Sequence, residues 1–133
     1  MKVLIADDSA EIRDRLVSTL SGVAGVEVVA AVSNTFDCVQ EFHRQWPDAV
    51  VLDFRMPGGG GVRALSEIKR VKPSAFTIML TAYPYKSYRD RCFEVGGDHF
   101  LHKATEFYQV PQLIRRFQDT FGHEGPPPLG RGA

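Results

Sequence analysis

The segment over residues 49–57 constrains the fold of this chain more than any other. Residues 49–52 are all apolar, which is typical of a strand buried on both faces. Asp53 stands where this strand ends, and Met56-Pro57 followed by four glycines prevents the strand or an early helix from continuing. Strands of this kind occur in parallel sheets that helices cover on both faces, so the segment favours an α/β fold.

Strand-like and helix-like segments alternate five times along the chain, as in consecutive parallel βαβ units. We therefore predict a flavodoxin-like (βα)5 three-layer sandwich with a parallel five-stranded sheet in the order 2-1-3-4-5. Strands are expected over residues 3–6, 26–32, 49–53, 75–80 and 99–102. The inward-facing side chains of the helices are expected to be Ile12, Leu16 and Leu20; Phe36, Val39, Phe42 and Trp46; Val62, Leu65, Ile68 and Val71; Tyr85, Tyr88, Cys92 and Val95; and Leu113, Ile114, Phe117 and Phe121.

Capping residues, prolines and glycines predict where several helices begin. Ser33 or Asn34 is expected to cap the second helix. Pro84 suits the first turn of the fourth helix, and the last helix is expected to start at Pro111. The glycine run at 58–61 lacks the lysine and hydroxyl of a Walker phosphate loop and is interpreted as a flexible connector.

Polar side chains follow four of the five predicted strands. Asp7 and Asp8 come after the first strand, Asp53 ends the third, and Thr81 and Lys103 end the fourth and fifth. In the predicted strand order, the crevice lies at the carboxyl ends of strands one and three. We therefore expect three carboxylates, one hydroxyl and one ammonium to meet at one edge of the sheet.

This combination of side chains predicts a metal-assisted reaction with phosphate. Crowded carboxylates repel one another unless one is protonated or a cation lies among them. Mg²⁺, or Mn²⁺ in its place, prefers oxygen ligands and binds one or two carboxylates together with phosphate oxygens. Asp53 is then a plausible phosphoryl acceptor, with Asp7 and Asp8 holding the metal and Lys103 as a second positive charge.

Composition restricts the classes of protein further. The 133 residues suffice for one ordinary domain. Sixteen basic residues balance sixteen acidic ones, so the net charge gives no overall attraction to nucleic acid or to an anionic membrane. No apolar stretch reaches transmembrane length and acids appear early in the chain, so a cytoplasmic location is expected. Cys38 and Cys92 are expected to be reduced thiols within helices.

Four separated motifs give the chain a specific resemblance. They are Asp7-Asp8, Asp53-x-x-Met56-Pro57-x-x-x-Gly61, Thr81-Ala82 and Lys103, each after the appropriate strand. This pattern resembles the receiver domain of two-component response regulators over residues 1–121. The resemblance implies a phosphorylation switch rather than a turnover enzyme, with a sensor histidine kinase or a histidine phosphotransfer protein as phosphodonor.

The resemblance also implies roles for individual residues. Asp53 would be the phosphoacceptor, Asp8 a direct metal ligand and Asp7 a ligand through water or metal. The Arg55 backbone carbonyl would complete the protein ligands of the metal. Further expected roles are a bond to a phosphoryl oxygen for Thr81, a pairing with phosphate for Lys103, a switch aromatic for Phe100, and tuning of the phosphorylation lifetime for Arg55 and Tyr83.

The resemblance places the output surface on the fourth helix, the fifth strand and the last helix, where a downstream protein target would bind. A homodimer is compatible with the same pattern. Neither nucleic acid nor membrane is expected to bind directly.

Two features bear on the end of the chain. Receivers commonly have proline after the lysine, whereas Ala104 follows Lys103 here, so we expect a trans peptide bond and a differently shaped loop. Residues 122–133 have little apolar content and are expected to be disordered. The chain is therefore either a stand-alone receiver or a fragment ending in a linker.

Three other functions are compatible with parts of the pattern. A degenerate receiver would use the fold only to bind proteins. A small Mg²⁺-dependent phosphatase with an aspartyl-phosphate intermediate would need a second acid and a lid, for which the chain has little room. A flavodoxin-like FMN or nucleotide binder would need a loop rich in Ser, Thr and Gly after the first strand, where this chain has Asp7-Asp8-Ser9-Ala10.

Overall fold

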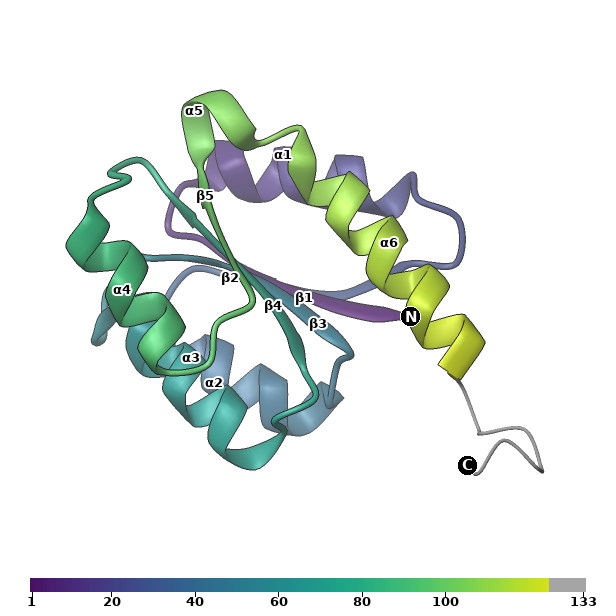
Figure 1. The fold of residues 1–133 in the computed structure, drawn as a ribbon, viewed down its shortest axis with the longest axis horizontal. Coiled ribbons are helices and arrows are strands. Elements are labelled where there is room, and N and C mark those ends of the chain that lie inside the picture. Colours follow the sequence, from purple (N-terminus) through teal and green to yellow (C-terminus); the bar gives the residue numbers. More distant parts are fainter. Residues whose placement is uncertain (125–133) are drawn as a thin grey trace.

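A five-stranded parallel sheet forms the centre of the molecule (Figure 1). A computed structural model describes the backbone of residues 1–124 and the side chains of residues 1–120. The sheet has the order β2-β1-β3-β4-β5, so the predicted flavodoxin-like topology is confirmed. The strands are β1 (Lys2–Ala6), β2 (Glu27–Val32), β3 (Ala49–Asp53), β4 (Phe76–Thr81) and β5 (His99–His102).

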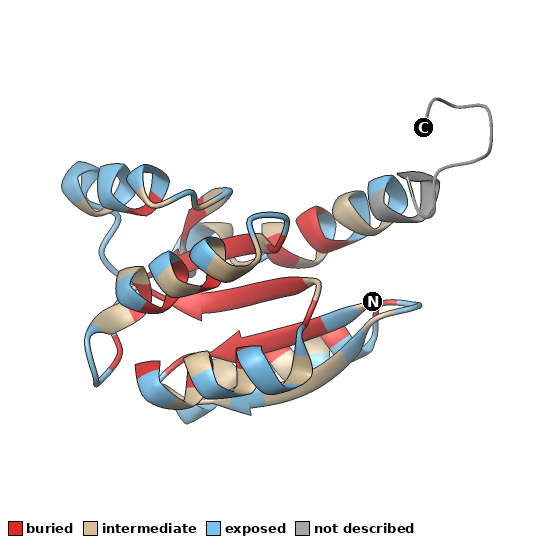
Figure 2. Ribbon diagram, turned by 90° about the horizontal axis from the view of Figure 1, so that it is seen from below, coloured by how far each residue is buried: buried red, intermediate tan, exposed pale blue. Residues whose placement is uncertain are grey.

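Helices cover both faces of the sheet and produce three layers (Figures 1 and 2). The helices are α1 (Ala10–Ser21), α2 (Thr35–Gln45), α3 (Gly60–Val71), α4 (Lys86–Glu94), α5 (Lys103–Glu106) and α6 (Gln109–Glu124). α2, α3 and α4 pack on one face, and α1 and α6 pack on the other. Within residues 1–124, no helix is long and apolar enough to cross a membrane.

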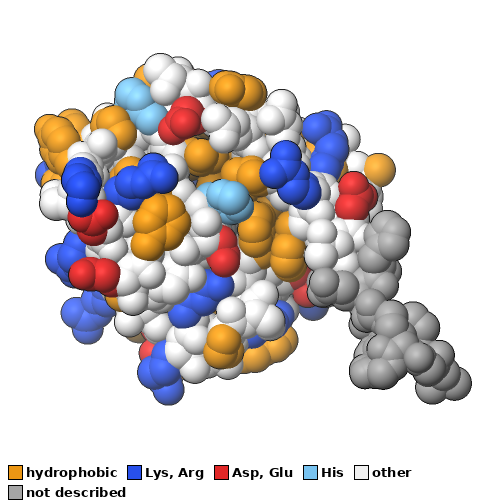
Figure 3. Space-filling model, viewed as in Figure 1, with side chains coloured by type: hydrophobic (Ala, Val, Ile, Leu, Met, Phe, Trp, Pro, Cys, Tyr) orange, Lys and Arg blue, Asp and Glu red, His pale blue; other side chains and the backbone are white. Residues whose placement is uncertain are grey.

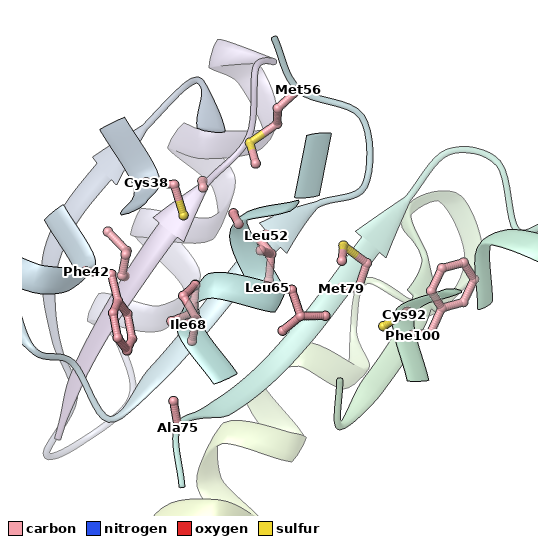
Figure 4. Close-up of a cluster of buried hydrophobic side chains, with 14 residues drawn as sticks. Cys38, Phe42, Leu52, Met56, Leu65, Ile68, Ala75, Met79, Cys92 and Phe100 are labelled. Carbon is pink, nitrogen blue, oxygen red and sulfur yellow. The ribbon is translucent and has the colours of Figure 1, made fainter. Parts of the chain in front are cut away.

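Side chains of the central strands point alternately to the two faces of the sheet and form a separate core on each face. On β3, Val50 and Leu52 belong to the core beneath α2, α3 and α4, whereas Ala49 and Val51 belong to the core beneath α1 and α6. Successive side chains of a strand point to opposite faces, so every residue of a doubly covered strand is buried. Figure 4 shows the first core, which Leu52 shares with Phe42 of α2.

The prediction for α2 is wrong at two of its four inward positions. Phe36 is 70% exposed and Trp46 is 46% exposed. The buried stripe of α2 runs through Thr35, Cys38 and Phe42 instead. Phe36 lies one position away from this stripe, about 100° around the helix. Trp46 follows the helix with a left-handed φ of 49°, which turns its side chain off the helical face.

The start of α4 also differs from the prediction. Pro84 precedes the helix, because Tyr85 is the N-cap and the first helical residue is Lys86. Tyr85 is 55% exposed, and Cys92 is the only fully buried residue of the helix. The predicted cap of α2 is confirmed as Asn34, whose side-chain oxygen accepts a hydrogen bond from the Asp37 amide.

The chain after β5 forms a helical turn that was not predicted. The peptide bond between Lys103 and Ala104 is trans, as expected, and Lys103 begins the short helix α5. The Glu106 carboxylate accepts a hydrogen bond from the His102 amide over 2.9 Å. This bond joins the N-cap residue of α5 to the end of the same helical turn and so stabilises the turn.

The last helix begins earlier and ends later than predicted. α6 starts at Gln109, and Pro111 lies within its first turn. The helix continues to Glu124, past the predicted domain end at residue 121. The rest of the tail predicted to be disordered, residues 125–133, lies outside the described residues.

Candidate functional site

Four strand ends bring the predicted site residues to one edge of the sheet. Asp7 follows β1, Asp53 ends β3, Thr81 ends β4 and Lys103 follows β5. The Lys103 Nζ atom lies 2.7 Å from Asp7 Oδ2 and 3.3 Å from Asp53 Oδ2. All three side chains are largely removed from solvent, with exposed fractions of 14%, 1% and 6% respectively. The lysine thus links acids from two adjacent strands.

Backbone amides orient the two buried carboxylates. The Ser9 amide donates to Asp7 Oδ1 over 2.9 Å, and the Arg55 amide donates to Asp53 Oδ1 over 3.3 Å. Ser9 is also the N-cap of α1, so the turn that starts this helix fixes Asp7 as well. Each carboxylate therefore keeps its Oδ2 atom directed at Lys103.

The acidic residues fit a hard divalent cation. Asp7, Asp8 and Asp53 each offer a carboxylate oxygen, and these oxygens lie within 4.8 Å of one another. Asp7 Oδ2 is buried and forms an ion pair with the Lys103 ammonium. Asp8 is exposed at the mouth of the group. Three carboxylates this close together, one of them exposed, are a donor set suited to Mg²⁺.

A crevice of about 290 Å³ gives access to Asp53. It is lined by Asp8, Asp53, Arg55, Tyr83 and Lys103, together with Ala82. Asp53 is therefore buried at its base but open on one side to a small ligand.

Burial and the neighbouring acid change the protonation of Asp53. Burial, followed by the negative charge of Asp7, raises the pKa of Asp53 to about 7, even though Lys103 and the Arg55 amide act in the opposite direction. Burial alone would lower the pKa of Lys103, but the hydrogen bonds and charges of Asp7 and Asp53 outweigh it and the pKa is raised. The lysine therefore stays charged, and a further cation would favour the ionised form of Asp53.

Comparison with known proteins identifies the family of the chain. The model of the response regulator receiver domain matches residues 3–115. The chain belongs to this family. The receiver domain is 35% identical over 108 residues to a protein-glutamate methylesterase/protein-glutamine glutaminase of Hahella chejuensis, covering 80% of this chain and 28% of that protein. It is 27% identical over 116 residues to response regulator GacA of Pseudomonas aeruginosa, covering 87% and 54% respectively.

A solved structure shows the same fold. The response regulator domain of Thermotoga maritima CheB is similar with a TM-score of 0.78 at 24% identity, covering 92% of this chain and 96% of that one. The receiver domain spans only 28% and 54% of the two curated relatives. Their full-length activities are therefore not transferred to it.

The two residues expected to act as a switch in the receiver are both buried. Thr81 is fully buried, and its hydroxyl accepts from the Tyr83 amide over 2.9 Å and donates to the Tyr83 carbonyl over 3.2 Å. Phe100 is buried and meets the Phe54 ring edge-on, with centroids 6.4 Å apart. Their roles in switching stay predictions.

The two residues expected to tune the receiver are in contact with each other. The Arg55 guanidinium lies over the Tyr83 ring, 4.9 Å from its centroid. Both side chains line the crevice and are exposed. This contact places a cation and an aromatic ring at the entrance to Asp53.

Sequence reasoning missed the role of Phe54 in this site. Phe54 stacks on Tyr88 of α4, with centroids 4.1 Å apart and an interplanar angle of 13°. Phe54 directly follows Asp53, so this stacking connects the site to α4, in which Cys92 is the only fully buried residue. The sequence signal was the aromatic residue directly after the strand-end aspartate.

We expect the stability of the metal-free receiver to fall as pH rises. The pKa of Asp53 is about 7 in the folded state against 3.8 ordinarily, so the folded state binds more protons between these values. The stability contribution is complete below the unfolded pKa and is lost as pH rises through the folded one, on the order of 2 kcal/mol. Urea unfolding in EDTA across this range measures the slope.

Asp53→Asn serves as the matched variant for this titration because asparagine does not ionise. Its unfolding free energy is expected to show a weaker decline with pH than that of the unsubstituted receiver. Mg²⁺ at pH 8 should raise the melting temperature of the unsubstituted protein, since a ligand of the folded state stabilises it. Identical pH profiles for the two proteins would contradict the raised pKa.

Proposed function

We propose that this receiver accepts a phosphoryl group from a phosphohistidine onto Asp53 and that the product changes its protein-binding surface. The observation that carries the proposal is the position of the Lys103 ammonium between Asp7 and Asp53 at the base of an open crevice. A sensor histidine kinase or a histidine phosphotransfer protein would supply the phosphoryl group. The family match supports this class of donor.

The transfer requires an ionised Asp53. One carboxylate oxygen forms a bond to phosphorus while the bond from phosphorus to the imidazole nitrogen breaks, and that nitrogen keeps the bonding electron pair. The Arg55 amide on Asp53 Oδ1 holds the carboxylate in one orientation during the approach. Lys103 supplies positive charge beside the attacking group.

Asp7, Asp8 and Asp53, with the Arg55 backbone carbonyl, would hold Mg²⁺ or Mn²⁺. The ion would neutralise charge on the phosphoryl oxygens when bound. The three carboxylate oxygens, which lie within 4.8 Å of one another, support this assignment.

Phosphorylation adds negative charge at Asp53 and so changes the partners of Lys103 and Thr81. Lys103 would pair with the phosphoryl group, and the Thr81 hydroxyl would leave Tyr83 to bind a phosphoryl oxygen. Loss of the two Thr81–Tyr83 hydrogen bonds would free the loop before α4. The surface formed by α4, β5 and α6 would then present a different face to a protein target, with Phe100 as the switch aromatic. Reversing a 1:99 population requires about 5.5 kcal/mol of differential stabilisation.

Labelling with a small phosphodonor tests the proposal. Incubation with acetyl phosphate and Mg²⁺ is expected to add one phosphoryl group, which peptide mass spectrometry should locate at Asp53. EDTA should prevent the labelling. Absence of labelling with Mg²⁺ would favour a degenerate receiver, and repeated turnover of a phosphomonoester would favour a phosphatase.

A further inference from the structure

A groove between α2, α3 and α4 lies away from the Asp53 crevice. Its volume is about 700 Å³, within the range of ligand-binding clefts. Three half-buried valines line it, Val39 of α2, Val62 of α3 and Val95 after α4. These valines pack on the core beneath, so they form an apolar floor.

An aromatic side chain and two arginines also line the groove. Phe36 is 70% exposed, the highest value among the large hydrophobic residues exposed in the described chain. Arg63 of α3 and Arg91 of α4 are exposed, and neither forms an ion pair with any described residue. Glu67, the acid in the lining, is engaged by Arg70 over 2.8 and 2.9 Å and by His43 over 3.1 Å. The uncompensated charge of the groove is therefore positive.

The wall of the groove formed by the loop before α3 is fixed to α2. The Thr35 amide donates to the Pro57 carbonyl over 2.9 Å, and the Thr35 hydroxyl donates to the Gly60 carbonyl over 3.1 Å. Arg63 lies close over Gly59, where an added Cβ would lie 2.5 Å from the Arg63 Cδ atom. These contacts preorganise the groove and reduce the entropy lost on binding.

We propose that this groove binds an acidic segment of a partner protein that carries an apolar anchor residue. The valine floor and Phe36 would receive the anchor, and Arg63 and Arg91 would pair with carboxylates on either side of it. Charge complementarity selects the occupant, because the groove has unpaired cations and no unpaired acid among its described lining residues. Figure 3 shows basic and acidic side chains interspersed on the face in view, and the whole chain has sixteen of each, so the attraction does not come from an overall positive charge.

This groove is separate from the Asp53 site, although Arg91 lies on α4, which is part of the proposed output surface. It includes none of Asp7, Asp8, Asp53 or Lys103. The proposal therefore does not depend on phosphorylation, and protein with Asp53→Asn should bind the same segment.

Selection from a phage-displayed library of random peptides tests the inference on the whole chain. Enriched peptides are expected to contain Asp or Glu near a large apolar residue. Their affinities are then measured by fluorescence anisotropy. The double variant Arg63→Glu, Arg91→Glu should have an affinity at least about tenfold lower than that of the unsubstituted protein. Phe36→Ser should also lower the affinity. All three residues are exposed, so melting temperatures should stay unchanged.

The matched control is Arg115→Glu with Arg116→Glu, which makes the same change of charge on α6 and should leave binding within about twofold. Enriched peptides without acidic residues, equal affinity for the double variant, or no enrichment over beads alone would each overturn the proposal. Self-association that the double variant abolishes would also overturn it, because a second copy of the chain would then occupy the groove.

Discussion

Asp53→Asn is expected to reduce Mg²⁺-dependent phosphoryl labelling at least about a hundredfold, to background. Asparagine has nearly the size of aspartate, but its amide is not a nucleophile toward phosphorus. Its side-chain oxygen can still accept from the Arg55 amide, which holds Asp53 Oδ1 over 3.3 Å. The loss should therefore reflect missing chemistry rather than a misfolded loop. Mass spectrometry after incubation with acetyl phosphate measures the labelled fraction.

Asp8→Asn provides the contrast to this variant. Asp8 is exposed at the mouth of the acidic group and is proposed to bind metal rather than phosphorus. Labelling should become slower and should recover in part at higher Mg²⁺ concentration. Labelling of the Asp53→Asn protein at the unsubstituted rate would remove Asp53 from the proposed mechanism.

Gly61→Ala is expected to destabilise the receiver by about 3 kcal/mol, because the new methyl group has no room. A Cβ atom at Gly61 would overlap the Asp53 carbonyl oxygen and would lie 3.0 Å from the Met79 sulfur. Relief of the overlap requires movement of α3 away from β3, at the strand end that carries Asp53. Urea unfolding should show the lower free energy, and the labelling rate should fall with it.

Gly22→Ala is the matched control for this substitution. Gly22 ends α1 with a φ of −82°, and a Cβ atom there would have its nearest neighbour at 3.5 Å. Alanine fits this position, so the unfolding free energy should change by less than about 1 kcal/mol. Equal effects at the two glycines would contradict the close approach of α3 to Asp53.

Within a single helix or strand, some predictions from the sequence were correct and others were wrong. In α2, the Asn34 cap and the buried Phe42 were predicted, whereas Phe36 was wrongly placed inward. Helical periodicity locates the buried face of a helix to within one residue. The elements that pack against the helix determine which of two neighbouring residues is buried. The glycine run at 58–61 was interpreted as a connector, although Gly60 and Gly61 start α3.

The order of the strands and the meeting of Asp7, Asp53 and Lys103 at one edge followed from the sequence alone. Both depend on local signals, since hydrophobic runs define strands and parallel strands end at the same edge. Only tertiary packing determined the pKa of Asp53, which is about 7, and the position of Arg63 and Arg91 beside an apolar groove with no ion pair to any described residue. These properties depend on distances and burial between segments far apart in the chain, which no local pattern specifies.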